Sequence, residues 1–245
     1  MVAKLYEAGA VMLGKLNMTE GATGGYHPEF DIPVNPWGED LWAGVSSSGS
    51  GVATAADLCF ASLGSDTGGS IRMPSAANGI VGLKPTYGRV SRYGVLPLAE
   101  SLDHVGPMTR SVADAAVAFE AIAGSDDRDP TSLPDLVPDM LDALRGGVEG
   151  LRIGFDRQYI SRNGSDIGDP GLVESIESAL ELLERLGTRT VELTMPDFPD
   201  VMYTLVTSEA YEAQKANYPS RADEYGPYFC DFLAHGAEIS STDYA

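Results

Sequence analysis

The chain has 245 residues, of which 43% are hydrophobic and 21% are charged. This is an ordinary globular composition, so intrinsic disorder and collagen-like repeats are excluded. No run of about eighteen apolar residues occurs, and we therefore expect no membrane-spanning helix. Sixteen basic residues against 36 acidic residues give a net charge of -20. A chain this acidic repels phosphate backbones, so we expect no direct contact with nucleic acid.

The acidic balance has two explanations that the sequence leaves open. A solvated acidic surface is one, and a protein adapted to a high-salt cytoplasm is the other, since the chain holds only four lysines. The two cysteines, Cys59 and Cys230, are too few for a disulfide framework in a chain of this length. The N-terminus lacks the basic and apolar regions of a signal peptide. We therefore expect a cytoplasmic protein.

The first half of the chain alternates short apolar runs with glycine-rich stretches. The pattern predicts a helix over residues 2–8 that stops at Gly9, a short buried strand over 10–13, loops over 19–51, and a closely packed helix over 52–63 that ends at Gly64. A further helix is predicted to begin after Ser111 and to stop at Gly124. Asp114 completes a variant capping box with Ser111, in which Asp takes the usual place of Glu or Gln.

The second half contains a pattern of strand, helix and strand. Residues 151–155 and 188–193 have the composition of strands, and residues 170–186 between them form an amphipathic helix closed by Gly187. This unit makes α/β the expected fold class. Residues 240–245 resemble a helix start, and both ends of the chain look cut. We expect one partial domain over 1–245, with a core at 1–124, a surface connection at 125–150 and a β-α-β and helical part at 151–245.

Two clusters rich in serine and glycine stand out, at residues 44–51 and 64–70. Glycines permit tight turns whose backbone N–H groups point inward, as an oxyanion hole requires. A serine at the end of such a turn can attack a carbonyl carbon. Two flexible surface turns are the alternative interpretation, and composition alone leaves both open. The three histidines, which are far apart, have no metal-ligand spacing.

The segment from Gly64 to Ser111, GSDTGGSIRMPSAANGIVGLKPTYGRVSRYGVLPLAESLDHVGPMTRS, resembles the amidase signature family. The upstream stretches AGAVMLGKLNMTE and NPWGEDLWAGVSSSGSG fit the same family. The resemblance is strong over residues 8–131 and looser beyond them. It implies a mixed β-sheet core sandwiched between helices, here incomplete, and an enzyme that hydrolyses amide C–N bonds with a Ser-Ser-Lys triad. It also implies that neither a metal nor a cofactor is needed.

The resemblance implies roles for individual residues. Ser70 corresponds to the nucleophile and Ser46 to the serine that carries a proton between the nucleophile and the lysine. The remaining implied roles are an oxyanion hole from the amides of Thr67, Gly68, Gly69 and Ser70, an ion pair of Asp66 with Arg72 that fixes the loop, and an orienting role for Ser47 toward Ser46. In this mechanism a neutral lysine with a lowered pKa is the base, and an acyl-enzyme forms on Ser70.

This sequence departs from the family at two places. The triad lysine belongs to a Gly-x-Pro-x-x-x-Lys-Asp segment that does not occur in residues 1–245, and Lys15 and Lys84 match other, structural positions. We therefore expect the 245 residues alone to be inactive or nearly so. Val45 and Ser48 replace glycines of the family's serine loop, and a positive φ at either position would strain that loop.

Three functions stay open. The first is an amidase acting on a small-molecule carboxamide. The second is the glutaminase subunit of a tRNA-dependent amidotransferase, which residues 88–94 favour, whereas residues 95–98 and 103–104 favour a general amidase. The third is an inactive remnant or interaction module. The resemblance is compatible with a homodimer or with binding to amidotransferase subunits, and it does not identify the amide substrate.

Overall fold

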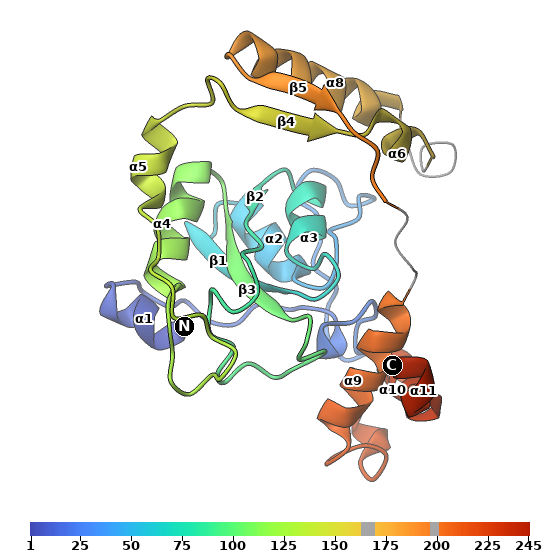
Figure 1. Ribbon diagram of the computed structural model, residues 1–245. Helices are drawn as coiled ribbons and strands as arrows, with labels where there is room; N and C mark the ends of the chain where they lie inside the picture. The colour runs from blue at the N-terminus through green and yellow to red at the C-terminus, as the bar shows by residue number, and fades with distance from the viewer. Residues whose placement is uncertain (163–169, 197–200) are drawn as a thin grey trace. The chain divides into compact units, whose positions relative to one another are not determined.

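The computed structural model describes residues 1–162, 170–196 and 201–245 (Figure 1). Contacts within the chain define two compact units. The first comprises Met1–Leu141 and Val201–Ala245, and the second comprises Asp142–Asp200. The predicted division at residues 124 and 150 remains a prediction about domain organisation. No helix in the described ranges is long and apolar enough to cross a bilayer.

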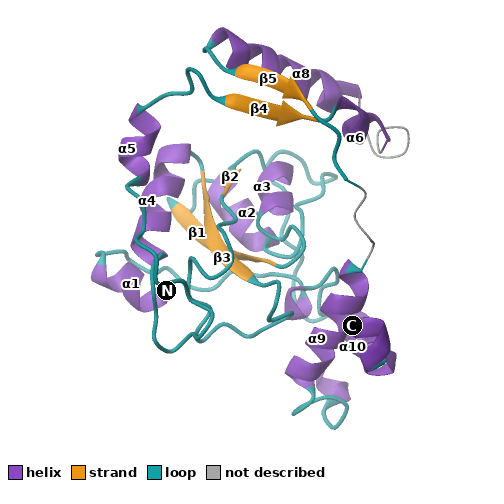
Figure 2. Cartoon of the chain, viewed as in Figure 1, coloured by secondary structure: helices purple, strands orange, loops and turns teal. Residues whose placement is uncertain are grey.

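The first unit is built on a small antiparallel sheet with helices around it (Figure 2). Its elements are α1 (Val2–Glu7), η1 (Glu20–Ala22), α2 (Ser48–Ala55), β1 (Ala61–Asp66), α3 (Arg72–Ala77), β2 (Val81–Gly82), β3 (His104–Thr109), α4 (Val112–Ile122), α9 (Met202–Gln214), η2 (Ala222–Glu224), α10 (Pro227–Glu238) and α11 (Ser241–Tyr244), with α5 (Met140–Arg145) at the border of the two units. The strand order is β1-β3-β2, and Asp66 lies opposite His104 in the register.

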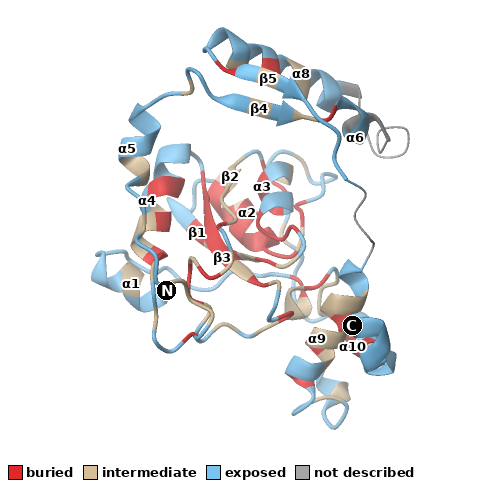
Figure 3. Cartoon of the chain, viewed as in Figure 1, coloured by how far each residue is buried: buried red, intermediate tan, exposed pale blue. Residues whose placement is uncertain are grey.

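The central strand β3 is buried along nearly its whole length (Figure 3). Val105 packs with Phe119 and Ile122 of α4 in one apolar cluster. The residues next to Val105 along the strand point the other way. On that opposite face, Met108 and Ile71 pack so closely against Gly64 of β1 that a side chain at this position would not fit. This two-sided burial confirms the α/β class with a sheet flanked by helices.

Helices α9 and α10 pack against each other through a second apolar cluster. Ala210, Phe229 and Leu233 are buried there together with Leu98 from the loop before β3. Two polar contacts join these helices to the rest of the unit. Glu20 accepts hydrogen bonds from the Gly226 N–H at the start of α10, and Glu209 of α9 accepts from Ser101.

The second unit contains a β-α-β arrangement. Its elements are β4 (Arg152–Phe155), α6 (Arg157–Arg162), α8 (Pro170–Arg185) and β5 (Arg189–Glu192). β4 and β5 pair in parallel, and α8 connects them along the chain and packs against β5. The helix ends before Gly187, whose φ is +96°. These observations confirm the strand, helix and strand predicted from the sequence.

Three predicted helix boundaries in the first unit are also confirmed. α1 ends just before Gly9, which has a φ of +83°. The side chain of Ser111 accepts the Asp114 N–H at the start of α4. A short helix, α11, begins after Ser240 with a complete capping box to Asp243.

Residues 10–13 do not form the buried strand that we predicted. They have no regular secondary structure and no strand pairing in the described structure, and Val11 and Leu13 are 83% and 74% exposed. A four-residue apolar run is compatible with a strand, but it carries no information about a partner strand. The prediction for this segment was wrong.

The predicted helix over residues 52–63 is confirmed only over residues 52–55. Helix α2 begins earlier, at Ser48, and ends at Ala55. Asp57 then adopts a φ of +61°, a left-handed conformation that Asp tolerates better than most residues. The chain reverses there and enters β1, which pairs along its whole length with β3. Small residues favour neither helix nor strand strongly, so the pairing with β3, far along the chain, decides that this segment forms a strand.

Candidate active site

Ser47 joins the two serine and glycine clusters. Its N–H donates to the Ser70 carbonyl at 3.3 Å. Its hydroxyl accepts from the Ser65 N–H at 3.2 Å and lies 3.3 Å from the Ser65 carbonyl, to which it donates. The hydrogen-bond partner of this hydroxyl is Ser65 of β1, and the implied role of Ser47 in orienting Ser46 stays a prediction. Ser47 holds the serine loop against the strand that leads to Ser70.

Ser46 is fully buried, and its hydroxyl is unusual. Its carbonyl accepts from the N–H groups of Thr19 at 3.2 Å and Ser48 at 2.9 Å, and the Val45–Ser46 peptide is cis. Its Oγ has no hydrogen-bond partner in the described ranges. Leaving a buried hydroxyl unpaired costs about 1–3 kcal/mol, so such a group calls for an explanation other than stability.

The serine loop reaches this conformation through Gly44. Its φ is +77°, and a Cβ there would lie 2.3 Å from the Cα of Pro74. Val45 and Ser48 do not have positive φ, and Ser48 is the first residue of α2. The strain that we considered at these two positions is therefore absent.

Ser70 is the last residue of the glycine loop, which we define as residues 66–70, and it is 8% exposed. The Gly69 N–H donates to Asp66 Oδ1 at 2.7 Å, so it is engaged within the loop. The N–H groups of Thr67, Gly68 and Ser70 have no acceptor among the residues that the structure describes. Of the four amides that the resemblance implies for an oxyanion hole, only that of Gly69 is bonded within the described ranges. The oxyanion hole and its four amides stay a prediction.

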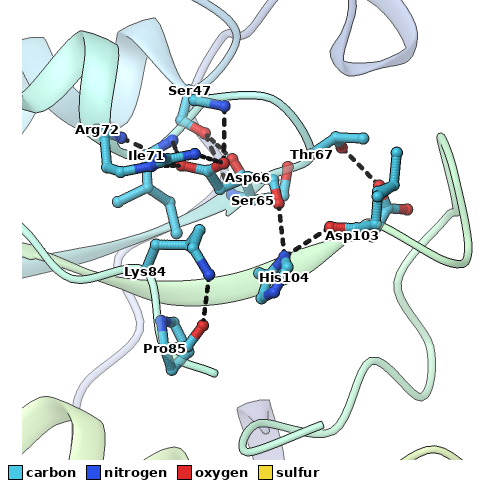
Figure 4. A network of polar contacts seen from close by, with 12 residues as sticks. Ser47, Ser65, Asp66, Thr67, Ile71, Arg72, Lys84, Pro85, Asp103 and His104 are labelled. Atoms are coloured by element: carbon cyan, nitrogen blue, oxygen red, sulfur yellow. Dashed lines mark hydrogen bonds and ion pairs between the residues drawn. The ribbon is translucent and has the colours of Figure 1, made fainter. Parts of the chain in front are cut away.

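Asp66 organises this loop from inside (Figure 4). Its fully buried carboxylate accepts from the N–H of Ile71 at 3.1 Å, in addition to that of Gly69. Arg72 donates to both of its oxygens, from Nε at 3.0 Å and Nη2 at 2.9 Å. Burial acts to raise the pKa of Asp66, but the bonds from Arg72 and the two amides outweigh it, and the net shift is downward. The ion pair expected between Asp66 and Arg72 is thus present.

Three polar residues beside the loop, Asp103, His104 and Lys84, were not predicted from the sequence to belong to the site. Asp103 accepts from the Thr67 hydroxyl at 2.5 Å, and His104 Nδ1 lies 3.1 Å from the Asp66 carbonyl (Figure 4). Burial lowers the pKa of His104 and, separately, the pKa of Lys84, whose ammonium donates to the Pro85 carbonyl at 2.8 Å. The only sequence signal for Asp103 was its place in the motif SLDHVGP, which does not reveal its partner.

A pocket of about 210 Å³ also lies in this region. Its lining includes Ser65, Asp103 and His104, but neither Ser46 nor Ser70. We therefore do not assign it to the substrate. No lysine ammonium in the described ranges is hydrogen-bonded to the hydroxyl of Ser46 or Ser70.

Known proteins resemble the chain in both sequence and structure. It is 45% identical to the putative amidase AmiD of Mycobacterium tuberculosis, over all of this chain and 51% of the relative. It is 46% identical to a glutamyl-tRNA(Gln) amidotransferase subunit of Syntrophobacter fumaroxidans, over 80% of this chain and 40% of that protein. The crystal structure of the peptide amidase of Stenotrophomonas maltophilia superposes with a TM-score of 0.81 at 32% identity, covering 99% of this chain and 56% of that one.

The chain thus spans about half the length of the curated relatives that it matches. The sequence model of the amidase family matches residues 1–239, which is nearly the whole chain. This match covers the serine loop, the glycine loop and both units. The chain belongs to the amidase family.

Proposed function

We propose that residues 1–245 carry the nucleophile of an enzyme that hydrolyses small carboxamides. Ser70 Oγ attacks the carbonyl carbon, and its proton passes through Ser46 to a neutral lysine. The free amides of the glycine loop donate to the oxygen on which negative charge develops. The C–N bond then breaks, and ammonia or an amine leaves with the relayed proton. Water attacks the acyl group on Ser70 and releases the carboxylic acid and the serine hydroxyl.

The observation that carries this proposal is the buried, unpartnered hydroxyl of Ser46. A relay hydroxyl must donate to a base and accept from the nucleophile, so a structural partner would compete with its function. The neighbouring hydroxyls are used differently, since Ser47 bonds Ser65 and Ser50 donates to the Leu63 carbonyl at 2.8 Å. Ser46 is the member of this cluster that fold contacts leave free for proton transfer.

The base is the family's lysine, which the resemblance assigns to a segment that does not occur in residues 1–245. Relatives about twice as long support this part of the proposal. The expected consequence is that residues 1–245 alone release no ammonia from aliphatic or aryl amides, whereas the full-length protein, as its gene encodes it, does. A cytoplasmic location and catalysis without a metal are parts of the proposal that rest on the sequence.

The test measures ammonia or amine release by the full-length protein and its variants. Ser70→Ala should abolish turnover, and Ser46→Ala should lower kcat by about 10²–10⁴-fold, the usual range for a lost acid-base group. Ser50→Ala is the matched control, because it removes a nearby buried hydroxyl that bonds only within the fold. A full-length protein that hydrolyses no amide, or turnover that survives Ser70→Ala, would contradict the proposal. Turnover by residues 1–245 alone would contradict the assignment of the base.

A second candidate is the glutaminase subunit of a tRNA-dependent amidotransferase. The 46% identity to such a subunit favours it, whereas coverage of the whole chain by the putative amidase, against 80% by that subunit, favours the first proposal. Purification of the full-length protein from its own cells separates the two. Recovery with partner subunits and glutamine-dependent ammonia release would support the amidotransferase, and an isolated protein active on simple amides would support the amidase.

A further inference from the structure

The glycine loop has an external support as well as the internal one from Asp66. The carboxylate of Asp103 is 6% exposed and accepts the Thr67 hydroxyl at 2.5 Å. The same carboxylate accepts the N–H groups of Leu98 at 2.9 Å and Ala99 at 3.1 Å. One buried anion therefore ties Thr67 to the loop that precedes β3.

That preceding loop is itself fixed. Glu209 of α9 accepts the Ser101 N–H at 2.9 Å and the Ser101 hydroxyl at 2.5 Å. Tyr244 donates to the same glutamate at 2.8 Å. Asp103 thus lies in a segment that is held by its own hydrogen bonds. Its contact can therefore limit the movement of Thr67 instead of moving with it.

Thr67 needs such a restraint because of the residues that follow it. Gly68 and Gly69 have no side chains to limit their backbone, and the N–H groups of Thr67 and Gly68 have no acceptor in the part of the chain that the structure describes. The contacts of Asp66 begin only at Gly69. The hydroxyl of Thr67 is therefore the polar attachment of the first half of this loop.

We propose that Asp103 is a positioning residue that holds the Thr67 amide where the developing oxyanion needs it. The inference rests on the proposed function, since it assigns a role in the same reaction. An oxyanion donor acts by being fixed before the charge develops, so a mobile Thr67 weakens binding of the transition state more than binding of the substrate. Asp103 touches neither substrate nor nucleophile in this role and acts through the Thr67 hydroxyl.

Thr67→Val is the sharpest variant. It keeps the shape of the side chain, removes the hydroxyl, and leaves the charge of Asp103 and its bonds to Leu98 and Ala99 in place. In the full-length protein we expect kcat on an aryl amide to fall about 10–100-fold with KM within about twofold, and the affinity for a boronic acid that mimics the tetrahedral intermediate to fall by a similar factor. Thr67→Ser, which restores the hydroxyl, should recover most of both losses.

A double-mutant cycle assigns the effect to the contact. Asp103→Ala should lower kcat less in the Thr67→Val background than in the wild type, because the bond is already absent. A merely structural contact predicts a lower Tm for Thr67→Val with unchanged kcat and boronate affinity. That result would overturn the inference.

The two proposals fail in different ways. Turnover that survives Ser70→Ala contradicts the proposed function, whereas normal turnover in Thr67→Val with loss in Ser70→Ala contradicts only the role of Asp103. Hydrogen exchange of the Thr67 and Gly68 amides gives a readout that needs no turnover. Thr67→Val should raise their exchange rates at least several-fold and Thr67→Ser should not, and equal rates in all three proteins would overturn the restraint itself.

Discussion

Replacing Asp66 by Asn should destabilise the fold, because the new amide cannot satisfy the donors around it. Oδ1 accepts from Gly69 N–H and Arg72 Nη2, and Oδ2 accepts from Ile71 N–H and Arg72 Nε. The Arg72 N–H also lies 3.4 Å from Oδ2, so the NH₂ group of the Asn side chain faces at least two N–H donors whichever way it is turned. At least one buried amide then loses a charged acceptor, and the arginine loses its counter-ion.

The magnitude follows from these contacts. A hydrogen bond to a charged group contributes about 1.5–3 kcal/mol to stability, and a half-exposed ion pair adds about 0–1 kcal/mol. Arg72 is 55% exposed, so we count its contribution at the low end. The expected loss for Asp66→Asn is about 2–4 kcal/mol, equivalent to roughly 5–15 °C in Tm for a domain of about 150–250 residues and to a smaller shift in a longer protein.

The assay is thermal unfolding of the full-length protein, followed by circular dichroism. Glu224→Gln is the matched control, because it breaks the ion pair with Arg221 in which both side chains are more than half exposed, and Tm should stay within about 1 °C. The pKa of Asp66 is lowered, so its stabilising effect is complete above about pH 5 and is lost as the pH falls below its ordinary value of 3.8. The Tm difference between wild type and Asp66→Asn should therefore stay constant from pH 7 to about pH 5 and narrow as the pH falls below about 4. A Tm for Asp66→Asn within 1 °C of wild type at pH 7 would refute the reasoning.

Three further predictions follow from the geometry and the charge. Gly44→Ala should lower Tm by several degrees, because the new Cβ would clash with Pro74 and the φ is positive. Gly147→Ala is the control, since its φ is +66° but the space around it is open, and it should lower the free energy of unfolding by only about 1 kcal/mol. Equal losses of stability in the two variants would argue against the clash. Ser46→Ala should change the Tm of the full-length protein little, because no described group of residues 1–245 bonds its hydroxyl and only the contact with the proposed base is lost. A large drop in Tm would indicate a structural partner. Raising NaCl from about 0.05 to 1 M should increase Tm steadily, because salt screens repulsion in a chain of net charge -20. A Tm independent of salt would contradict this account of the acidic surface.

Local signals in the sequence were sufficient to predict elements whose first and last residues are marked by capping residues, glycines or a clear hydrophobic pattern. α4 begins with the Ser111 cap and ends before Gly124, and the parallel pair β4 and β5 follows from two apolar strands that flank an amphipathic helix. β1 was missed because its residues are small and its strand form depends on pairing with β3, some forty residues later in the chain. No periodicity within β1 contains that information.

The candidate site likewise has features that the sequence predicts and features that only the structure reveals. Motif resemblance selected Ser46 and Ser70 as the candidate relay serine and nucleophile, and these roles stay predictions. The engagement of the Gly69 N–H by Asp66 and the contact of Thr67 with Asp103 required three-dimensional structure, since both depend on how the loop turns. Orientation of a single N–H or hydroxyl group is not encoded in residue type.

The most direct test of the central claim is to trap the acyl-enzyme. The full-length protein is mixed with an activated aryl ester or amide, quenched with acid, digested and analysed by mass spectrometry. We predict an acyl group on the peptide that contains Ser70, absent in Ser70→Ala and accumulating to a lower level in Ser46→Ala. An acyl group on another residue, or continued turnover in Ser70→Ala, would contradict the account.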